Sequence, residues 1–351
     1  MILQPGDAVP SGATYLPSTL DHVFWGRLPC AKDRPVLDVD AGDEVLVDTV
    51  SHEGILEDQG RDPRAFFSAA GAPGVLDDVV AIAASDLPRT VGVDGPHVVT
   101  GPIAVHGARV GDLLAIRVLE TTPRVPYGVV SNRHGRGALP AEYPLAGDVY
   151  SVYADLDENG RGRIPLVPGG ERYATFDLHP FLGIMGVAVA GNERPHSVPP
   201  GPHGGNIDIN LLTVGSTLYL PVQVDEALAY VGDPHFAQGD GEVALTAMEA
   251  SLRVRLTFDV IAREDALASF GALVGPLAET AEFLVPTGMD ADLDVAVQDC
   301  VRAAIALLQA RFGMDPRHAY AYLSAATDFN ISQVVDLVKG AHARIRKSDF
   351  A

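Results

Sequence analysis

The sequence predicts a mainly antiparallel β body that ends in an α-helical C-terminal segment. Apolar and polar residues alternate over 36–50, 216–224 and 251–260, as in strands with one buried face. The 351 residues include 36 glycines and 26 prolines, which suit many turns between short strands. After residue 290 the apolar residues instead recur at helical spacing, at Leu293, Val297, Val301, Ala304 and Leu308.

Short strands and turns are expected through the first half of the chain. Alternating residues on both sides of Ala41-Gly42-Asp43 predict a β-hairpin over 36–50. Asp62 followed by Pro63 predicts the start of a short helix. Residues 75–84 fit either a strand or a helix. Further strands are expected at 21–26, within 89–122 and on both sides of a turn at 158–160.

The second half of the body contains the clearest strand patterns. Residues 181–190 are small and apolar, and the glycines Gly183 and Gly186 favour a tightly packed buried strand. In 251–260 the outward positions include Arg253 and Arg255, which are expected to face solvent. The inward positions of that strand are Leu252, Val254, Leu256, Phe258 and Val260.

The C-terminal region is expected to contain three helices. The first stops at Gly313, and Asp315-Pro316 opens the second. A third is expected over 331–340, capped by Asp328 or Asn330. The predicted organisation is therefore a β-rich body over 1–285, with a lobe boundary near 125–170, and a helical segment over 286–351 packed on it.

Charge and composition exclude several classes of partner. The net charge of -21 argues against binding nucleic acid or an anionic membrane. No run of about 18 apolar residues occurs, so no membrane-spanning helix is expected. The first residues lack a basic and apolar leader, which makes the cytoplasm the expected location. The two cysteines are far apart in sequence, which disfavours a cysteine zinc cluster.

Two glycine-rich turns concentrate the residues that could carry chemistry. Residues 201–210 and 230–249 flank one predicted strand, and each contains a histidine and at least one acid. Histidine and carboxylate are natural ligands of zinc and similar divalent ions. The alternative is a pair of ordinary turns with solvated acids. The polar residues concerned are His203, Asp208, Asp233, His235, Gln238, Asp240, Glu242 and Glu249.

Two other segments present polar side chains at loops. His52 and Glu53 follow a predicted strand that ends at Asp48, so they fit either a functional position or an exposed turn. The long polar loop expected over 126–144 contains His134, and loops of this kind often line a site.

Several familiar catalytic devices are absent from the sequence. It has no GxSxG elbow, no HExxH motif, no phosphate-binding loop and no GxGxxG fingerprint. Its only lysines are Lys32, Lys339 and Lys347, which stand outside any segment suited to a Ser-Ser-Lys or Glu-Lys-Cys amidase. The remaining histidine and carboxylate constellation suits a metal-activated water with a carboxylate base.

Four segments resemble the acetamidase/formamidase family. They are TGPIAVHGARVGD (100–112), PHGGNID (202–208), GDPHFAQGDGE (232–242) and SAATDFNISQVVD (324–336), in the family's order and over nearly the whole chain. The resemblance implies a β-sandwich-like fold, release of ammonia from short amides such as formamide and acetamide, and a homodimer or larger homo-oligomer. One departure is DTVSHEGI (48–55), where many relatives have Glu and Asp at the places of Asp48 and Ser51, so that His52 becomes a further candidate ligand.

The resemblance also implies roles for individual residues. A divalent ion is expected, zinc first and calcium as the alternative, and Glu242 or Asp240 is the expected general base. The candidate ligands are His203, His235, Asp233, Asp208, Asp48 and His52. The candidate substrate contacts are Gln238, Gly204, Gly205 and His134, with glycine N–H groups facing the oxyanion.

The competing hypothesis is a non-catalytic β-sandwich binding protein stabilised by a metal such as calcium. Calcium prefers six to eight oxygen ligands, so the two histidines count against it as the sole ion. Metal content measured together with ammonia release would separate the two hypotheses.

Overall fold

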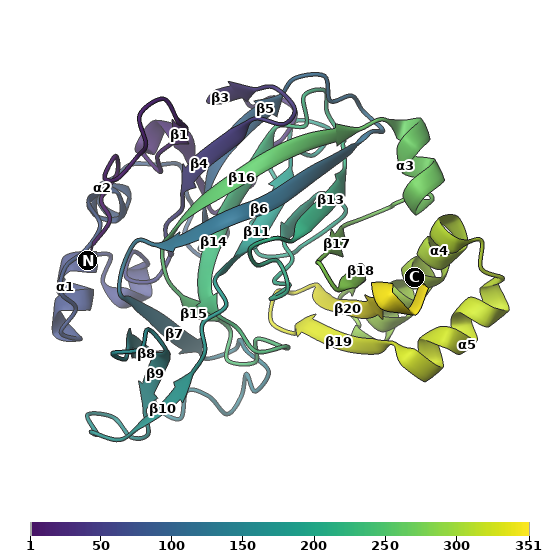
Figure 1. Ribbon diagram of the computed structural model, residues 1–351. Helices are drawn as coiled ribbons and strands as arrows, with labels where there is room; N and C mark the ends of the chain where they lie inside the picture. The colour runs from purple at the N-terminus through teal and green to yellow at the C-terminus, as the bar shows by residue number, and fades with distance from the viewer. Residues whose placement is uncertain (1, 351) are drawn as a thin grey trace.

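The structure, a computed structural model, describes residues 2–350 and consists mainly of two large β-sheets with helices at their margins (Figure 1). The strands are β1 (Thr14–Leu16), β2 (Val23–Trp25), β3 (Leu37–Val39), β4 (Glu44–Asp48), β5 (Val98–Val105), β6 (Leu113–Pro123), β7 (Tyr127–Arg133), β8 (Val149–Leu156), β9 (Gly162–Pro165), β10 (Tyr173–Phe176), β11 (Phe181–Val187), β12 (Gly204–Asn206), β13 (Thr217–Pro221), β14 (Ala229–Ala237), β15 (Met248–Glu249), β16 (Leu252–Ile261), β17 (Leu277–Glu279), β18 (Phe283–Asp290), β19 (Asp328–Gln333) and β20 (Lys339–Arg346). The helices are α1 (Pro63–Ala69), α2 (Asp77–Ala84), α3 (Arg263–Phe270), α4 (Leu293–Phe312) and α5 (Pro316–Ala326), with short 3-10 turns η1 (Leu20–His22), η2 (Glu57–Gln59) and η3 (Lys347–Phe350).

The first sheet has nine strands in the order β1-β4-β16-β6-β13-β17-β18-β20-β19. All pairs in it are antiparallel except β1 with β4. The long strands β6 and β16 lie side by side at its centre (Figure 1). Leu252, Val254, Leu256 and Phe258 of β16 are fully buried, which confirms the inward face expected from their alternation.

The second sheet has eleven strands and packs face to face on the first. Its main path is β10-β9-β8-β7-β15-β14-β11-β12, and β5 joins it by pairing with β14, β2 and β3. One continuous apolar core contains Val47, Ile116 and Leu256 from the first sheet together with Leu182 and Phe236 from the second. The sandwich-like, mainly β body expected from the sequence is therefore confirmed.

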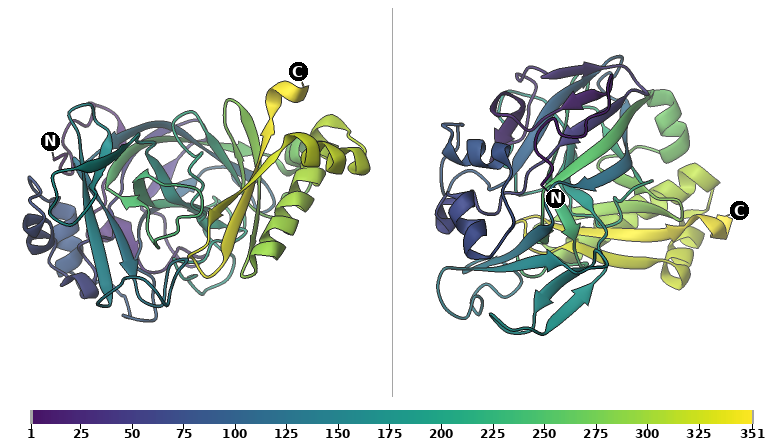
Figure 2. Two further views of the ribbon diagram at one scale, coloured as in Figure 1. Left: turned by 90° about the horizontal axis from the view of Figure 1, so that it is seen from below. Right: turned by 60° about the vertical axis from the view of Figure 1, so that its left-hand side comes forward.

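Helices α4 and α5 cover one end of the first sheet, beside β18 and β20 and away from α1 and α2 (Figures 1 and 2). Asp292 caps the start of α4 through the backbone N–H groups of residues 294 and 295, and Gly313 ends it in the left-handed conformation. Asp315 and Pro316 open α5 as expected. No helix within residues 2–350 combines the length and apolar character that crossing a membrane requires.

Three local predictions were wrong, each because strand pairing decided the conformation. Residues 36–50 do not form a hairpin: β3 pairs with β5 in the second sheet, while β4 pairs with β1 and β16 in the first, so the turn at Gly42 crosses between sheets. The third C-terminal helix is absent, since residues 328–346 form the antiparallel pair β19–β20. Arg253 is buried rather than solvent-facing, because it pairs with Asp48 on the neighbouring strand β4.

Candidate active site

A pocket with a volume of about 410 Å³ opens beside the end of β14, and histidines and carboxylates form its floor. These groups come from segments far apart in sequence: His52 follows β4, His97 precedes β5, Asp233 lies on β14 and Glu249 on β15. Strand β14 brings them together because it pairs with β5, β11 and β15 at once. The sheet register, rather than any local motif, therefore assembles the floor.

Asp233, whose φ is 51°, and His235 both lie on β14, and their side chains meet. Opposite them on β11 is Gly183, where an added Cβ would lie 2.7 Å from Asp233 Oδ2 and 2.8 Å from His235 Cε1. Only glycine leaves room for these side chains at that point. The Gly-containing buried strand expected over 181–190 thus has a direct packing role at the site.

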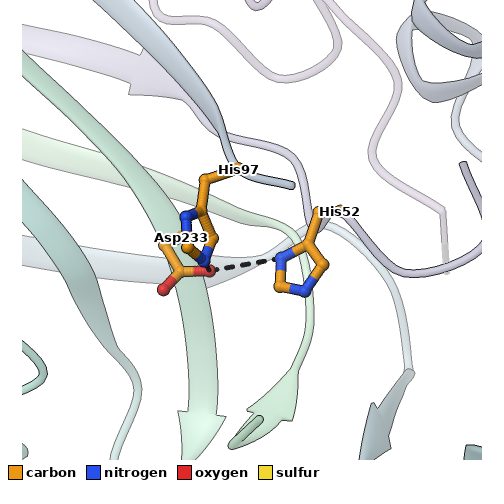
Figure 3. Close-up of side chains that lie close together, drawn as sticks. All are labelled: His52, His97 and Asp233. Carbon is orange, nitrogen blue, oxygen red and sulfur yellow. Dashed lines mark ion pairs between the residues drawn. The ribbon is translucent and has the colours of Figure 1, made fainter. Parts of the chain in front are cut away.

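His52, His97 and Asp233 converge on one carboxylate oxygen (Figure 3). His52 Nδ1 lies 3.4 Å from Asp233 Oδ1, and His97 Nε2 lies 3.8 Å from the same oxygen. The two rings meet edge to face at 5.0 Å. His52 Nδ1 and Asp233 Oδ1 are both buried and make no hydrogen bond with any residue in 2–350. Such orphaned buried polar atoms mark a place where a ligand or ion completes the structure.

A second group surrounds His235, immediately behind the first. His235 Nε2 lies 3.1 Å from Asp233 Oδ2 and 3.1 Å from Glu249 Oε1. Its Nδ1 lies 3.0 Å from Gln238 Oε1, and the Gln238 amide donates to the backbone oxygen of Asp208 at 2.9 Å. Gln238 therefore holds His235 from behind, in the position of a supporting residue rather than a substrate contact.

Three further carboxyl groups, of Asp208, Glu242 and Asp336, are buried beside these residues. Burial, strengthened by the neighbouring carboxyls, raises the pKa of each of the three well above its ordinary value. Neither carboxyl oxygen of Asp208 has a hydrogen-bond partner among residues 2–350. Glu242 lines the pocket, and its carboxyl makes no hydrogen bond or ion pair with the described part of the chain.

The floor attracts positive charge. Burial lowers the pKa of His52, but contacts with Asp233 and Glu53 outweigh burial and raise that pKa to about 10. At Glu249, by contrast, burial outweighs the contacts with the histidines and raises the pKa of the carboxyl to about 7. His97, by contrast, is held neutral, because burial lowers its pKa to about 3. A neutral imidazole beside partly compensated carboxylates is the donor set that zinc prefers.

Among residues 2–350, three overlapping groups of side chains could hold a metal ion. Within each group the potential ligand atoms lie within 4.8 Å of one another. The donor types, nitrogen from histidine and oxygen from carboxylate, fit a divalent transition ion better than calcium. The groups are His52, His97 and Asp233; Asp208, His235 and Glu242; and Asp233, His235 and Glu249.

Five of the residues expected at the site are brought together, namely His52, Asp208, Asp233, His235 and Glu242. His134 lies at the mouth of the same pocket, where it is exposed. Gln238 contacts His235 as described above.

The structure does not bring the other expected residues to the cluster. Asp48 is engaged by Arg253 at 2.6 and 3.0 Å. Asp240 lies at the surface, where it accepts from Arg344 at 2.9 Å. His203 is buried outside the pocket and its neighbour Gly205 would meet the His203 ring at 3.0 Å if it carried a Cβ. Gly204 and Gly205 pair with β11 in the sheet and do not line the pocket.

The sequence analysis missed His97 and Asp336 and gave Glu249 no role. His97 follows Gly95-Pro96 directly before a strand, and His235 follows Asp233-Pro234 within one, so a repeated Pro-His step was the available signal. Asp336 lies in the segment 324–336 that carries part of the family resemblance, but it was read there as part of a helix.

Comparison with known proteins gives one consistent family. The acetamidase/formamidase family model matches residues 80–193 and 187–344. The chain is 28% identical over 311 residues to a formamidase of Methylophilus methylotrophus, covering 71% of this chain and 75% of that protein. It is 27% identical over 245 residues to an acetamidase of Mycolicibacterium smegmatis, covering 54% of this chain and 59% of that protein.

Crystal structures with the same fold carry related names. An acetamidase from Bacillus halodurans superposes with a TM-score of 0.74 at 24% identity, covering 96% of this chain and 98% of that one. An acetamidase from Yersinia enterocolitica gives a TM-score of 0.74 at 24% identity, with 99% and 96% covered. At these identities the structural likeness shows the fold alone. The match to the family model shows the family. The chain belongs to the acetamidase/formamidase family of amide hydrolases.

Proposed function

We propose that this amidase hydrolyses a small aliphatic primary amide, releasing ammonia, at a divalent ion held by His52, His97 and Asp233. The observation that carries the proposal is the convergence of His52 Nδ1 and His97 Nε2 on Asp233 Oδ1, with no hydrogen bond at His52 Nδ1 or at that oxygen. We favour zinc because two imidazoles and a carboxylate match the ligands of catalytic zinc sites.

The proposed ligand set differs from the one implied by the sequence resemblance. His97 replaces His203, since His97 faces the pocket and His203 does not line it. His235 contacts the other oxygen of Asp233 and so orients the ligand from the second side. A bound zinc ion would supply Lewis acidity, acidifying a water and polarising the amide carbonyl.

Glu242 is the residue we assign as general base. Its carboxyl faces the pocket without a partner, so it is free to take the proton of the attacking water and deliver it to the departing amine. Burial and the neighbouring carboxyls raise the pKa of Glu242 well above its ordinary value. Glu249 is less suited, because His235 already occupies one of its oxygens at 3.1 Å.

The size of the pocket bears on the substrate. A volume of about 410 Å³ exceeds what formamide or acetamide fills, given that one water occupies about 30 Å³ in the liquid. The test of function therefore uses primary amides of increasing acyl length, from formamide upward, and measures ammonia release together with the metal content of the purified protein.

The decisive variant is His97→Ala. It is expected to lose bound zinc and ammonia release together while keeping its circular dichroism spectrum, because His97 contributes a ligand and little packing. Full metal occupancy in this variant would overturn the ligand assignment. Ammonia release by fully metal-depleted wild-type protein would overturn metal dependence, leaving the amidase assignment intact.

A further inference from the structure

We propose that Glu53 is a positioning residue, which fixes the ring of His52 so that its Nδ1 faces Asp233 and the metal site. The inference rests on the proposed function only in that His52 is taken to be a ligand. Glu53 contacts His52 but does not line the pocket, so its role is exerted through the histidine.

The His52 ring lies between the Glu53 carboxylate on one side and those of Asp233 and Glu249 on the other. Its Nε2 is 3.4 Å from Glu53 Oε1, while its Nδ1 is 3.4 Å from Asp233 Oδ1 and 3.9 Å from Glu249 Oε2. When a cation binds one ring nitrogen of an imidazolium, the proton on that nitrogen is released. The proton that remains stays on the other nitrogen, which is the one with the better fixed acceptor. Glu53 supplies that acceptor at Nε2, which leaves the Nδ1 lone pair directed at Asp233.

The Glu53 carboxylate is itself held rigidly. Ser131 Oγ and Gln59 Nε2 both donate to its Oε2, and an Arg133 guanidinium N–H donates to Oε1 at 3.3 Å. The Gln59 side chain in turn accepts from the backbone N–H of Gly54 at 2.7 Å. With three side chains donating to its carboxylate, Glu53 is 1% exposed and cannot follow His52 if the ring rotates.

The position of Glu53 behind His52 matches a common arrangement at metal sites. Metal-binding histidines whose second ring nitrogen faces a carboxylate are more basic and better oriented than free ones.

The second proposed histidine ligand gives an internal comparison. His97 Nδ1 lies 3.1 Å from the hydroxyl of Ser197, which is a neutral partner. The two ligands thus differ in support, a carboxylate for His52 and a hydroxyl for His97. Removing the charge behind His52 should accordingly weaken metal binding more than removing the hydroxyl behind His97.

The experiment measures the zinc dissociation constant by competition with a chelator in wild type, Glu53→Gln and Ser197→Ala. Glu53→Gln keeps the size of the side chain and is expected to weaken zinc binding about 10- to 100-fold, the usual effect of removing such a partner. Ser197→Ala should weaken it less. Asp58→Asn is the matched control, because Asp58 shares Arg133 with Glu53 but does not contact His52; its affinity should stay within about twofold of wild type.

Thermal unfolding of the metal-free proteins separates positioning from a purely structural role. An unchanged zinc affinity in Glu53→Gln, with or without lower metal-free stability, would overturn the proposal. If Glu53→Gln does not fold, Ser131→Ala, which removes one of the bonds holding Glu53, should show a smaller weakening in the same direction, and unchanged affinity there would likewise overturn it. Zinc affinity is read without substrate, so a failure to find any hydrolysed amide would count against the proposed function alone.

Discussion

Two buried aspartates, one in each sheet, differ in the kind of positive charge that lies beside them. Asp48 on β4 is fully buried and is bound by Arg253 at 2.6 Å, with Arg124 at 3.5 Å. Asp233 on β14 is 4% exposed, and the groups within ion-pair distance of it are imidazoles. Asp48 is thus neutralised by permanent cations of the chain, whereas Asp233 is not.

The difference separates a structural carboxylate from a functional one. A buried charge must be compensated, and arginine does so permanently because it cannot lose its proton in a protein. Histidines can release their protons to solvent when a metal ion binds, so the cation can replace the protons as the charge that compensates Asp233. Burial of an acid alone therefore identifies neither role; the partner decides it.

The largest effect is expected from removing the proposed base next to this floor. Glu242→Gln keeps size and hydrogen bonding but cannot accept a proton, so turnover should fall by about two to four orders of magnitude. Metal content and thermal stability should stay near wild type, as judged by metal analysis and thermal unfolding.

Asp240→Asn is the control for that variant, since Asp240 lies two residues away and pairs with Arg344 at the surface. It should keep wild-type turnover. Normal turnover in Glu242→Gln, accompanied by a lower melting temperature, would instead assign Glu242 a structural role.

The second effect tests the arginine-compensated side of the comparison. Asp48→Asn leaves the buried Arg253 without its counter-charge, whereas Arg124 keeps its ion pair with Asp78 at 2.8 Å. Breaking the buried pair should cost about 3–5 kcal/mol of stability. Urea unfolding measures this cost, and metal content measured under native conditions should not change. A folded variant that has lost its metal would show that Asp48 contributes to the site after all.

The smallest effect concerns His203, the histidine that the fold keeps out of the pocket. Burial lowers its pKa to about 4, below the value near 6.5 of an unfolded histidine. The unfolded state then binds more protons between these two pH values, so His203 contributes stability above pH 6.5 that is lost as the pH falls towards 4.

Replacing His203 by leucine should accordingly make unfolding less sensitive to acid between pH 6.5 and 4, with metal content and turnover near wild type. Urea unfolding at a series of pH values measures the acid sensitivity. Metal analysis measures the metal content, and ammonia release from the amide panel measures the turnover. Loss of the metal in this variant would restore His203 as a ligand.

Some features of this protein followed from the sequence alone, because they depend on neighbours in the chain. Alternation identified β16, the cap and glycine signals identified α4 and α5, and the four family segments identified an amide hydrolase. Each of these is a local regularity that residues a few positions apart can impose.

Other features were decided only by tertiary structure, because they depend on which strands pair. The register of β14 with β5 and β15 places His97 and Glu249 beside Asp233, although these residues are more than a hundred and about fifteen positions away in sequence. The pairing of β4 with β16 places Arg253 on Asp48 and removes that acid from the candidate ligands. Charge compensation acts through space over a few ångströms, so no spacing in the sequence could show which acid meets an arginine and which meets a histidine.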